Sequence, residues 1–231
     1  MKLLLTNDDG VFAPGLMTMA AHLADKGYSW AVVAPDRERS SVGHAITLTR
    51  PLRLWSVSQG LYPEGQNVNA CDGTPSDCVV LGIEEVQPET DMVISGINSG
   101  PNVGDDLTYS GTVSAAMEGV IMGCPSIAVS LNCSSRDDTC HYRTAAVVVE
   151  KILKVIEKEP LEEGVLLNVN VPNLSLTLLR GVKVTPKGVR LYEGKVTKLR
   201  DPHGRAYYWV SGRPEDQLVE GCDVWALANG Y

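Results

Sequence analysis

The apolar positions in the first part of the chain fall into short runs that alternate with segments of helical period. Residues 2–6 (KLLLT) form an apolar run with a polar end, which is typical of a buried parallel strand. Behind Pro14, which suits a first helical turn, apolar side chains recur at helical spacing at Leu16, Met19, Ala20 and Leu23. Residues 29–34 (SWAVVA) are the next apolar run. Together these segments predict a β-α-β unit, the start of a doubly wound sheet.

This alternation continues to about residue 171 and predicts an α/β fold with a mostly parallel sheet. Further strands are expected at 91–97, 126–131 and 165–171. Further helices are expected from a Thr74 cap to Leu81, at 111–123 and at 142–157. Residues 44–70 instead alternate between apolar and polar positions, which predicts an inserted β-hairpin.

Residues 172–231 differ in character from the part before them. Short strands are expected at 182–185, 189–193 and 205–211, and glycines and prolines separate them. The segment is too short to predict as an independent domain. We therefore treat 1–231 as a single domain, with a core over 1–171 and an extension over 172–231 that serves as an arm in oligomerisation.

The composition is that of a globular protein, with 44% hydrophobic and 21% charged residues. A formal net charge of −8 argues against a nucleic-acid polymer as partner, because such a binder carries a basic face. No stretch approaches the roughly 18 consecutive apolar residues of a membrane span, and the first residues lack the apolar core of a signal peptide. These features predict a cytoplasmic protein without a membrane partner.

The cysteines stand at positions 71, 78, 124, 133, 140 and 222, and none forms a C-x-x-C pair. Cys133 and Cys140 flank a polar loop and would be able to pair under oxidation. A reducing cytosol argues against that disulfide, so we expect both side chains to be thiols.

Three polar clusters follow predicted strands. They are the segments 7–10 (NDDG), 35–41 (PDRERSS) and 95–102 (SGINSGPN). Ligands of open α/β sheets bind beyond the carboxyl ends of the strands, so the fold would bring these clusters to one edge.

The adjacent acids of the first cluster indicate a cation, because neighbouring carboxylates repel unless something positive holds them together. Asp8, Asp9, a serine from 40–41 and Asn98 would supply the oxygen ligands that a hard divalent cation prefers. Without His or Cys, this set fits Mg²⁺ or Mn²⁺ better than zinc. The alternative is that Asp8 or Asp9 caps the following helix or turn.

Small polar residues open the next predicted helix, at 109–114 (YSGTVS), where backbone N–H groups would bind an anion. The alternative is plain N-capping by Ser110 or Thr112. A cation and a helix N-terminus at one crevice together indicate phosphate-ester chemistry. No dinucleotide fingerprint follows the first strand, and neither a P-loop nor a G-x-S-x-G motif occurs.

Four other basic residues have simpler interpretations. His44 lies near the second cluster and would either protonate a leaving group or form a loop hydrogen bond. Arg37 and Arg39 would contact phosphate or, as we favour, pair with the acids beside them. His22 falls in a predicted helix and is interpreted as structural.

At this point the motifs closely resemble those of the SurE (survival protein E) family of metal-dependent 5′/3′-nucleotidases with acid phosphatase activity. The matching stretches are TNDDG at 6–10, APDRERS at 34–40, GTPSDCV at 73–79, SGINSGPNVG at 95–104, YSGTVSAAMEG at 109–119, DPHGRAYYW at 201–209 and the GCDVWALANGY end. Two features depart from the family pattern. His203 stands where the family usually has Arg, and the chain ends at Tyr231, where the family usually continues with a short strand.

The resemblance implies a Rossmann-like core with a β-rich extension exchanged between subunits of a homodimer or homotetramer. It also implies one divalent metal ion per subunit. The implied metal ligands are Asp8, Asp9, Ser40 and Asn98. The implied phosphate pocket comprises Asn102, Ser110, Gly111 and Thr112.

The leading hypothesis is a metal-dependent phosphomonoesterase that hydrolyses nucleoside 5′-monophosphates, with 3′-monophosphates as further substrates. Asp8 or Asp9 would act as a base on a metal-activated water or as a covalent nucleophile, and the sequence does not decide between these roles. One alternative is a sensor that binds a nucleotide or metal without turnover. Another is a structural oligomer in which the polar loops are only caps.

Overall fold

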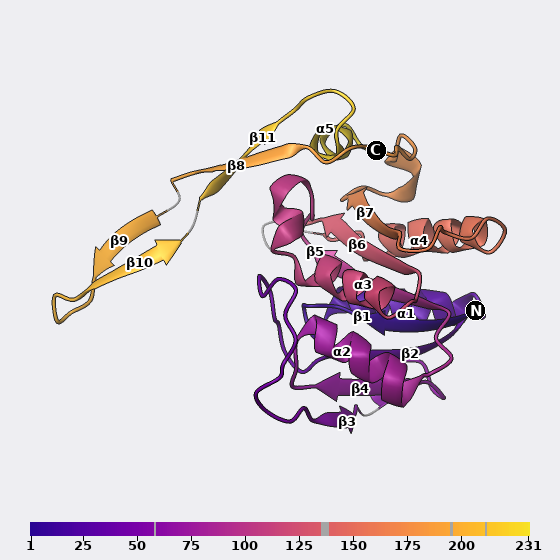
Figure 1. Ribbon diagram of the computed structural model, residues 1–231. Coiled ribbons are helices and arrows are strands. Elements are labelled where there is room, and N and C mark those ends of the chain that lie inside the picture. Colours follow the sequence, from indigo (N-terminus) through magenta and orange to yellow (C-terminus); the bar gives the residue numbers. More distant parts are fainter. Residues whose placement is uncertain (58, 135–138, 195, 211) are drawn as a thin grey trace.

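One seven-stranded sheet organises the molecule (Figure 1). The computed structural model describes residues 1–57, 59–134, 139–194, 196–210 and 212–231. The strands lie in the order β3-β4-β2-β1-β5-β6-β7. Their bounds are β1 Lys2–Thr6, β2 Ser29–Pro35, β3 Leu54–Ser56, β4 Asn67–Cys71, β5 Met92–Ser99, β6 Ser126–Asn132 and β7 Leu166–Pro172. Every neighbouring pair is parallel except β3 with β4, which confirms the predicted α/β fold with a mostly parallel sheet.

Helices cover both faces of this sheet. One face packs against α1 (Pro14–Asp25) and α4 (Tyr142–Ile156). The other packs against α2 (Pro75–Leu81) and α3 (Gly111–Ile121), which lie side by side in Figure 1. The chain moves from β1 outward to β2 and β4 and then returns to β5 on the other side of β1. The carboxyl ends of β1 and β5 therefore meet at a topological switch point, where α/β proteins bind ligands.

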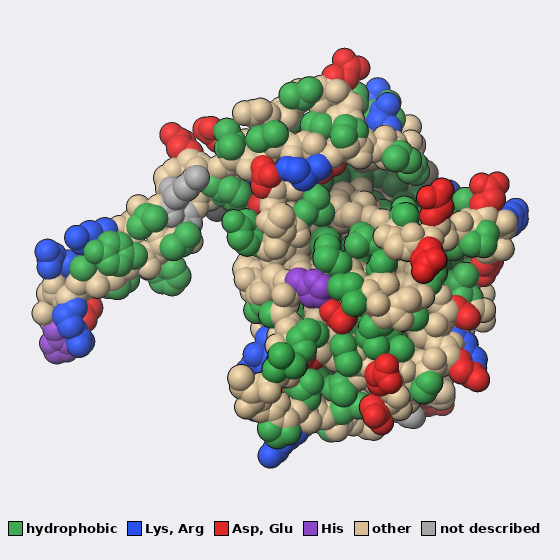
Figure 2. All heavy atoms as spheres, viewed as in Figure 1, with side chains coloured by type: hydrophobic (Ala, Val, Ile, Leu, Met, Phe, Trp, Pro, Cys, Tyr) green, Lys and Arg blue, Asp and Glu red, His purple; other side chains and the backbone are tan. Residues whose placement is uncertain are grey.

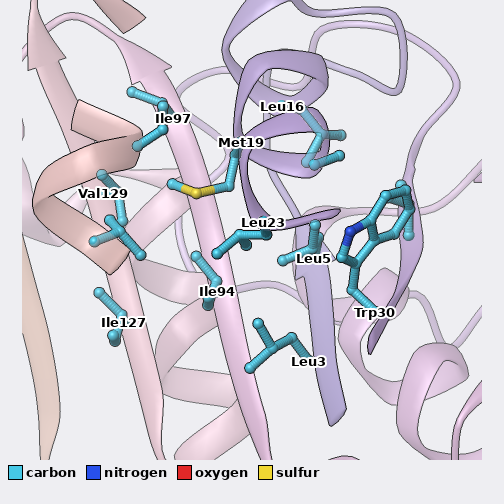
Figure 3. Packing of buried hydrophobic residues seen from close by; sticks show 14 of the residues in the cluster. Leu3, Leu5, Leu16, Met19, Leu23, Trp30, Ile94, Ile97, Ile127 and Val129 are labelled. Carbon is cyan, nitrogen blue, oxygen red and sulfur yellow. The ribbon is translucent and has the colours of Figure 1, made fainter. Parts of the chain in front are cut away.

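Alternating side chains on β1 create the two apolar layers. Leu3 and Leu5 belong to the core beneath α1 and α4, whereas Leu4 belongs to the core beneath α2 and α3. Figure 3 shows the helical stripe predicted from the sequence, with Leu16, Met19 and Leu23 of α1 directed at the sheet. All six of these side chains are fully buried, so the period of the sequence and the layers of the fold agree.

The predicted Thr74 cap is confirmed as a reciprocal capping box. The Thr74 hydroxyl accepts the Asp77 N–H at 3.1 Å, and the Asp77 carboxylate accepts the Thr74 N–H at 2.8 Å. The helix α2 that follows continues into a π-helical turn, η2 (Gly82–Val86). Short 3-10 turns complete the body, namely η1 (Gln59–Leu61), η3 (Gly104–Thr108) and η4 (Leu176–Leu178).

The inserted hairpin predicted over 44–70 is confirmed only for the antiparallel pair β3 and β4. β4 joins the main sheet as a parallel neighbour of β2, and only the three residues of β3 pair with it in antiparallel fashion. Residues 44–53 form no strand, because side-chain carboxylates, rather than a neighbouring strand, accept hydrogen bonds from backbone N–H groups of this segment. The N–H of Thr47 donates to Asp77, and the N–H of Arg53 donates to Asp72, each at 2.9 Å. Alternation of apolar and polar residues does not distinguish a strand from an extended segment held in this way.

The C-terminal part forms an arm, which we define as the strands β8 (Val189–Glu193), β9 (Val196–Arg200), β10 (Ala206–Val210) and β11 (Arg213–Gln217). β8 pairs with β11, and β9 pairs with β10, both in antiparallel fashion. Figures 1 and 2 show this ribbon projecting away from the body. The predictions for 189–193 and 205–211 are confirmed. The strand expected at 182–185 is wrong, since none of the described segments pairs with those residues. The sequence analysis missed β9, β11 and the helix α5 (Asp223–Ala228).

The expectation that Cys133 and Cys140 are thiols is also wrong, because a disulfide joins them. Cys133 directly follows β6 and Cys140 lies just before α4, and their two Cα atoms are 5.7 Å apart. That separation lies within the ordinary disulfide range. Our expectation considered only the redox compartment and not the distance between the two cysteines. In the described part of the chain, none of the helices has the length and apolar character that crossing a membrane requires.

Gly15 sets how closely α1 approaches the sheet, and it provides a test of the packing. A Cβ at this position would collide with the backbone carbonyl oxygen of Ile97 on β5, which cannot move aside as a side chain does. We therefore expect Gly15→Ala to lower the free energy of unfolding by about 1–3 kcal/mol, measured by urea denaturation. Gly60→Ala is the matched control, since a Cβ there meets nothing within 4 Å. Equal stability of both variants would contradict this view of the α1–β5 contact.

Candidate active site

A cavity of about 680 Å³ opens at the carboxyl edge of the sheet, beside the switch point. Its lining comes from the ends of β1 and β5, from the loop after β2, from the turn before α3 and from the arm. The lining residues are Asp8, Asp9, Glu38, Ser40, Ser41, Asn98, Ser99, Gly100, Pro101, Asn102, Asp106, Tyr109, Ser110, Ser134 and Tyr192. The three polar clusters singled out in the sequence therefore meet in one place.

The turn after β1 is held by Asn7 rather than by the acids that follow it. The buried Asn7 side chain donates to the Gly10 carbonyl at 2.9 Å and accepts the Gly10 N–H at 3.1 Å. Gly10 has a φ of +100°, and a Cβ there would lie 3.0 Å from the backbone of Arg37. Ala13 occupies the N-cap of α1 and makes no side-chain cap. Asp8 and Asp9 are therefore not helix or turn caps, and that alternative is removed.

Asp8 is almost fully buried, with 4% of its surface exposed. The Thr112 hydroxyl, at the start of α3, donates to the Asp8 carboxylate. Burial raises the pKa of Asp8, and the Thr112 hydrogen bond only partly opposes that shift. A Cβ on Gly111 would lie 2.7 Å from the Asp8 Cβ, so this glycine allows α3 to pack against the carboxylate.

Asp9 is more open to the cavity and accepts the Ser99 N–H, at the end of β5, at 3.1 Å. Burial, followed by the charge of Asp8 and then that of Glu38, raises the pKa of Asp9 to about 6. None of the ion pairs among the described residues neutralises Asp8 or Asp9. Two adjacent acids thus lie in the cavity without a positive partner from that part of the chain.

The other two predicted metal ligands also line the cavity. The Ser40 hydroxyl donates to the Glu38 carboxylate at 2.7 Å. The Asn98 amide nitrogen donates to the Gly100 carbonyl at 2.8 Å, which directs its Oδ1 away from that carbonyl. Among the described residues, no three His, Cys, Asp or Glu side chains gather as a metal-holding group. A cation here would therefore depend on the two carboxylates together with hydroxyl and amide oxygens.

Two of the four residues predicted to form the phosphate pocket line the cavity, and the other two lie behind its wall. Asn102 and Ser110 line the cavity, whereas Gly111 and Thr112 lie behind it against Asp8. The Ser110 hydroxyl accepts the Val113 N–H at 3.1 Å and caps α3, so the N-capping interpretation holds for Ser110 and not for Thr112. The Asn102 amide donates to Ser130 at 2.7 Å. Anion binding by these residues stays a prediction.

The other basic residues discussed in the sequence analysis lie outside the cavity lining. His44 lies within 2.6 Å of Glu118 on α3 and is outside the cavity lining, which favours its interpretation as a loop hydrogen bond. Arg39 pairs with Asp36 at 3.3 Å, as we favoured. The buried His22 contacts Glu150 at 2.8 Å, as expected of a structural histidine. His203 lies in the turn between β9 and β10.

The sequence analysis missed several cavity residues, namely Glu38, Asp106, Tyr109, Ser134 and Tyr192 as lining side chains. Tyr109 belongs to the 109–114 motif, so its position beside Ser110 was enough to predict that it lies at the cavity. Tyr192 lies on β8, more than eighty residues further along the chain, and no local pattern links it to the site.

The cavity wall is acidic and carries no base in the described part of the chain. Asp8, Asp9, Glu38 and Asp106 line it, and no Lys, Arg or His is present among the described lining residues. A phosphate ester would be repelled by such a wall in the absence of a cation. The site is therefore suited to a cation that binds together with an anion.

The chain is similar to known proteins over its whole length. The family model described as Survival protein SurE matches residues 3–194. A 5′-nucleotidase SurE of Geobacter metallireducens is 47% identical over 232 residues, which cover 100% of this chain and 88% of the relative. A 5′/3′-nucleotidase SurE of Serratia proteamaculans is 45% identical over 234 residues, with 100% and 87% covered. The crystal structure of the SurE protein from Aquifex aeolicus has a TM-score of 0.84 and 42% identity, and the match covers 100% of this chain and 90% of that one.

The raised pKa of Asp9 predicts that this acid destabilises the protein at neutral pH when divalent cations are removed. The folded-state pKa of about 6 lies above the ordinary 3.8, so stability present below pH 4 is lost between pH 4 and 6. In chelated protein we expect Asp9→Asn to raise the free energy of unfolding at pH 7 by on the order of 2 kcal/mol. The advantage should disappear near pH 4 in urea denaturation.

Asp105 is the matched control with the opposite sign, because its hydrogen bond with Lys187 lowers the pKa of Asp105. Asp105→Asn should therefore reduce stability at pH 7, and the loss should fade as the pH drops below the ordinary range of an aspartate. If Asp9→Asn instead lowered stability equally at pH 4 and pH 7, the assignment of an uncompensated charge to Asp9 would be wrong.

Proposed function

The chain belongs to the survival protein SurE family, and on that premise we propose that it is a 5′-nucleotidase that hydrolyses nucleoside 5′-monophosphates in the acidic cavity with one bound Mg²⁺ or Mn²⁺. The observation that carries the proposal is the pair of adjacent acids, the buried Asp8 and the half-buried Asp9, without a positive partner among the described residues. The name of the Serratia relative extends the proposal to nucleoside 3′-monophosphates.

Four side chains are proposed to hold the cation, namely Asp8, Asp9, Ser40 and Asn98. They fit a hard divalent ion because all four offer oxygen and two of them offer negative charge that lacks compensation. When bound, such an ion supplies the positive charge that a phosphate ester needs in this acidic cavity and lowers the pKa of a bound water. The absence of His and Cys from the set favours Mg²⁺ or Mn²⁺ over zinc.

The residues of the chain would then have different roles in hydrolysis. Asp8 is fixed by Thr112, so it serves mainly as a rigid anionic ligand. Asp9 is the more open carboxylate and is the one we assign to proton removal or to direct attack on phosphorus. Ser110 and Asn102 would orient the phosphate at the start of α3, where the backbone N–H groups point toward negative charge.

The arm is proposed to join copies of this chain into a homo-oligomer. Its exposed apolar side chains include Val196, Leu199, Tyr207, Tyr208, Trp209 and Val210. Figure 2 shows this apolar surface standing clear of the body. A two-stranded ribbon is marginally stable alone, and an exposed patch of this kind marks an interaction site. A cytoplasmic location stays a prediction.

Phosphate release from a panel of nucleoside 5′- and 3′-monophosphates tests the enzymatic proposal. Release should stop on chelation and return with Mg²⁺ or Mn²⁺. Asp9→Ala should reduce kcat/KM by at least roughly a hundredfold with unchanged circular dichroism, because it removes a charged ligand. Asp25→Ala, an exposed acid at the end of α1, should behave as wild type.

Full activity of Asp9→Ala, or release that chelation does not affect, would overturn the metal assignment. Nucleotide-dependent melting shifts without phosphate release would favour the sensor instead.

Trp209 tests the assembly proposal, since 62% of its surface is exposed on β10. We expect Trp209→Glu to shift the protein toward the monomer in sedimentation velocity, because a charge would have to be desolvated in the contact. Leu61→Glu is the matched control, because Leu61 is an apolar residue on η1, outside the arm, with 55% of its surface exposed. A wild-type protein that sediments as a monomer would rule out the proposed role of the arm.

A further inference from the structure

The cavity is larger than phosphate chemistry alone requires. Its volume of about 680 Å³ falls within the roughly 300–1,000 Å³ of sites that enclose a whole small-molecule ligand. The proposed cation ligands and phosphate contacts account for only part of the lining. Two aromatic side chains, Tyr109 and Tyr192, belong to the remainder and have no role in the hydrolysis described above.

Tyr109 presents an open ring on a fixed backbone. Its side chain is 67% exposed although it borders the cavity. Its N–H donates to the Asp106 carbonyl at 3.0 Å, and its carbonyl accepts the Gly43 N–H at 3.3 Å. Among the described residues, its ring has no aromatic or cationic partner. The aromatic ring of Tyr109 is therefore a large apolar surface that borders the cavity and is exposed to solvent.

Tyr192 approaches the same cavity from the arm. Its hydroxyl donates to the Asp106 carboxylate at 2.6 Å, and Arg190 pairs with that carboxylate at 3.0 Å. Burial and the neighbouring Asp106 raise the pKa of Tyr192 to about 12, so the ring stays neutral at physiological pH. Asp216 holds Arg190 in turn, through contacts of 2.6 and 2.9 Å. This network fixes where the Tyr192 ring stands.

We propose that Tyr109 and Tyr192 form the subsite for the nucleobase, with Tyr109 as the main stacking surface; the inference rests on the proposed nucleotidase function. Asp8 and Asp9 lie on the side of the cavity proposed to take the phosphate with its cation. The wall at Tyr109 and Tyr192 offers two rings and the carboxylate of Asp106, which Arg190 pairs with, and no positive charge among the described lining residues. A nucleobase suits such a wall, because each base has a π-face that stacks on an aromatic ring. Stacking tolerates any base, so the site should favour purines only through their larger rings.

The test compares a nucleoside 5′-monophosphate with ribose 5-phosphate, which has the same reacting group and sugar but no base. For wild type, kcat/KM should be roughly five- to a hundredfold higher for the nucleotide, which is the range expected of one stacked base. Tyr109→Ala should lose most of this preference, through KM rather than kcat. Tyr109→Phe should keep it, since the ring remains. Ribose 5-phosphate should be hydrolysed equally by all three proteins, which also verifies their folding.

Trp55→Ala is the matched control, because Trp55 is an exposed aromatic residue on the edge strand β3 and does not line the cavity. It should keep the wild-type preference for the nucleotide. Equal rates for the two esters in wild type, or an unchanged preference in Tyr109→Ala, would overturn the base subsite while the phosphatase stands. Failure of wild type to release phosphate from either ester would overturn the proposed function and the subsite together.

Discussion

The side-by-side placement of the buried Asp8 and the half-buried Asp9 is the constraint on which the rest of the site depends. Two like charges are kept close because three elements hold them from different directions. β1 positions their backbone through the Asn7 turn, α3 contributes the Thr112 hydroxyl to Asp8, and the end of β5 contributes the Ser99 N–H to Asp9. The hydrophobic layers around β1 hold the backbone in place, so the two carboxylates cannot relieve their repulsion by moving apart. The cation of the proposed function would relieve it.

A second link connects the arm to the same site. The turn η3 carries Asp106 and leads directly into Tyr109 and the start of α3. On its other side, Asp106 receives Arg190 and Tyr192 from β8. The base of the arm is therefore part of the cavity wall, and a change in how the arm is seated would move Tyr192 and the Asp106 turn together. The proposed assembly through the arm and the proposed substrate binding would thus be structurally coupled.

The features that the sequence predicted well are those that depend on neighbouring residues. The strand β1, the stripe on α1 and the Thr74 capping box each follow from residues a few positions apart, and the convergence of Asp8, Ser40 and Asn98 follows from the topology of parallel sheets. The failures involve contacts that no periodicity encodes, between distant and between nearby residues. Thr112 contacts Asp8 across 104 positions, β9 and β11 exist only by pairing, and the disulfide joins two cysteines that are seven residues apart. No local period contains that information.

The acidity of the cavity has a thermodynamic consequence for its ligands. Because the described lining offers four carboxylates and no base, a bound divalent cation would reduce the repulsion that a phosphate ester experiences, and a bound phosphate ester would add to the attraction that the cation experiences. Binding of one must then strengthen binding of the other by the same factor, since linkage between two ligands is reciprocal. Gly111 and Asp9 are each less stabilising locally than another residue would be, because glycine is flexible and the Asp9 carboxylate is partly removed from water. Both place negative charge where the cation would bind, since Gly111 lets α3 pack against Asp8 and Asp9 is itself an acid.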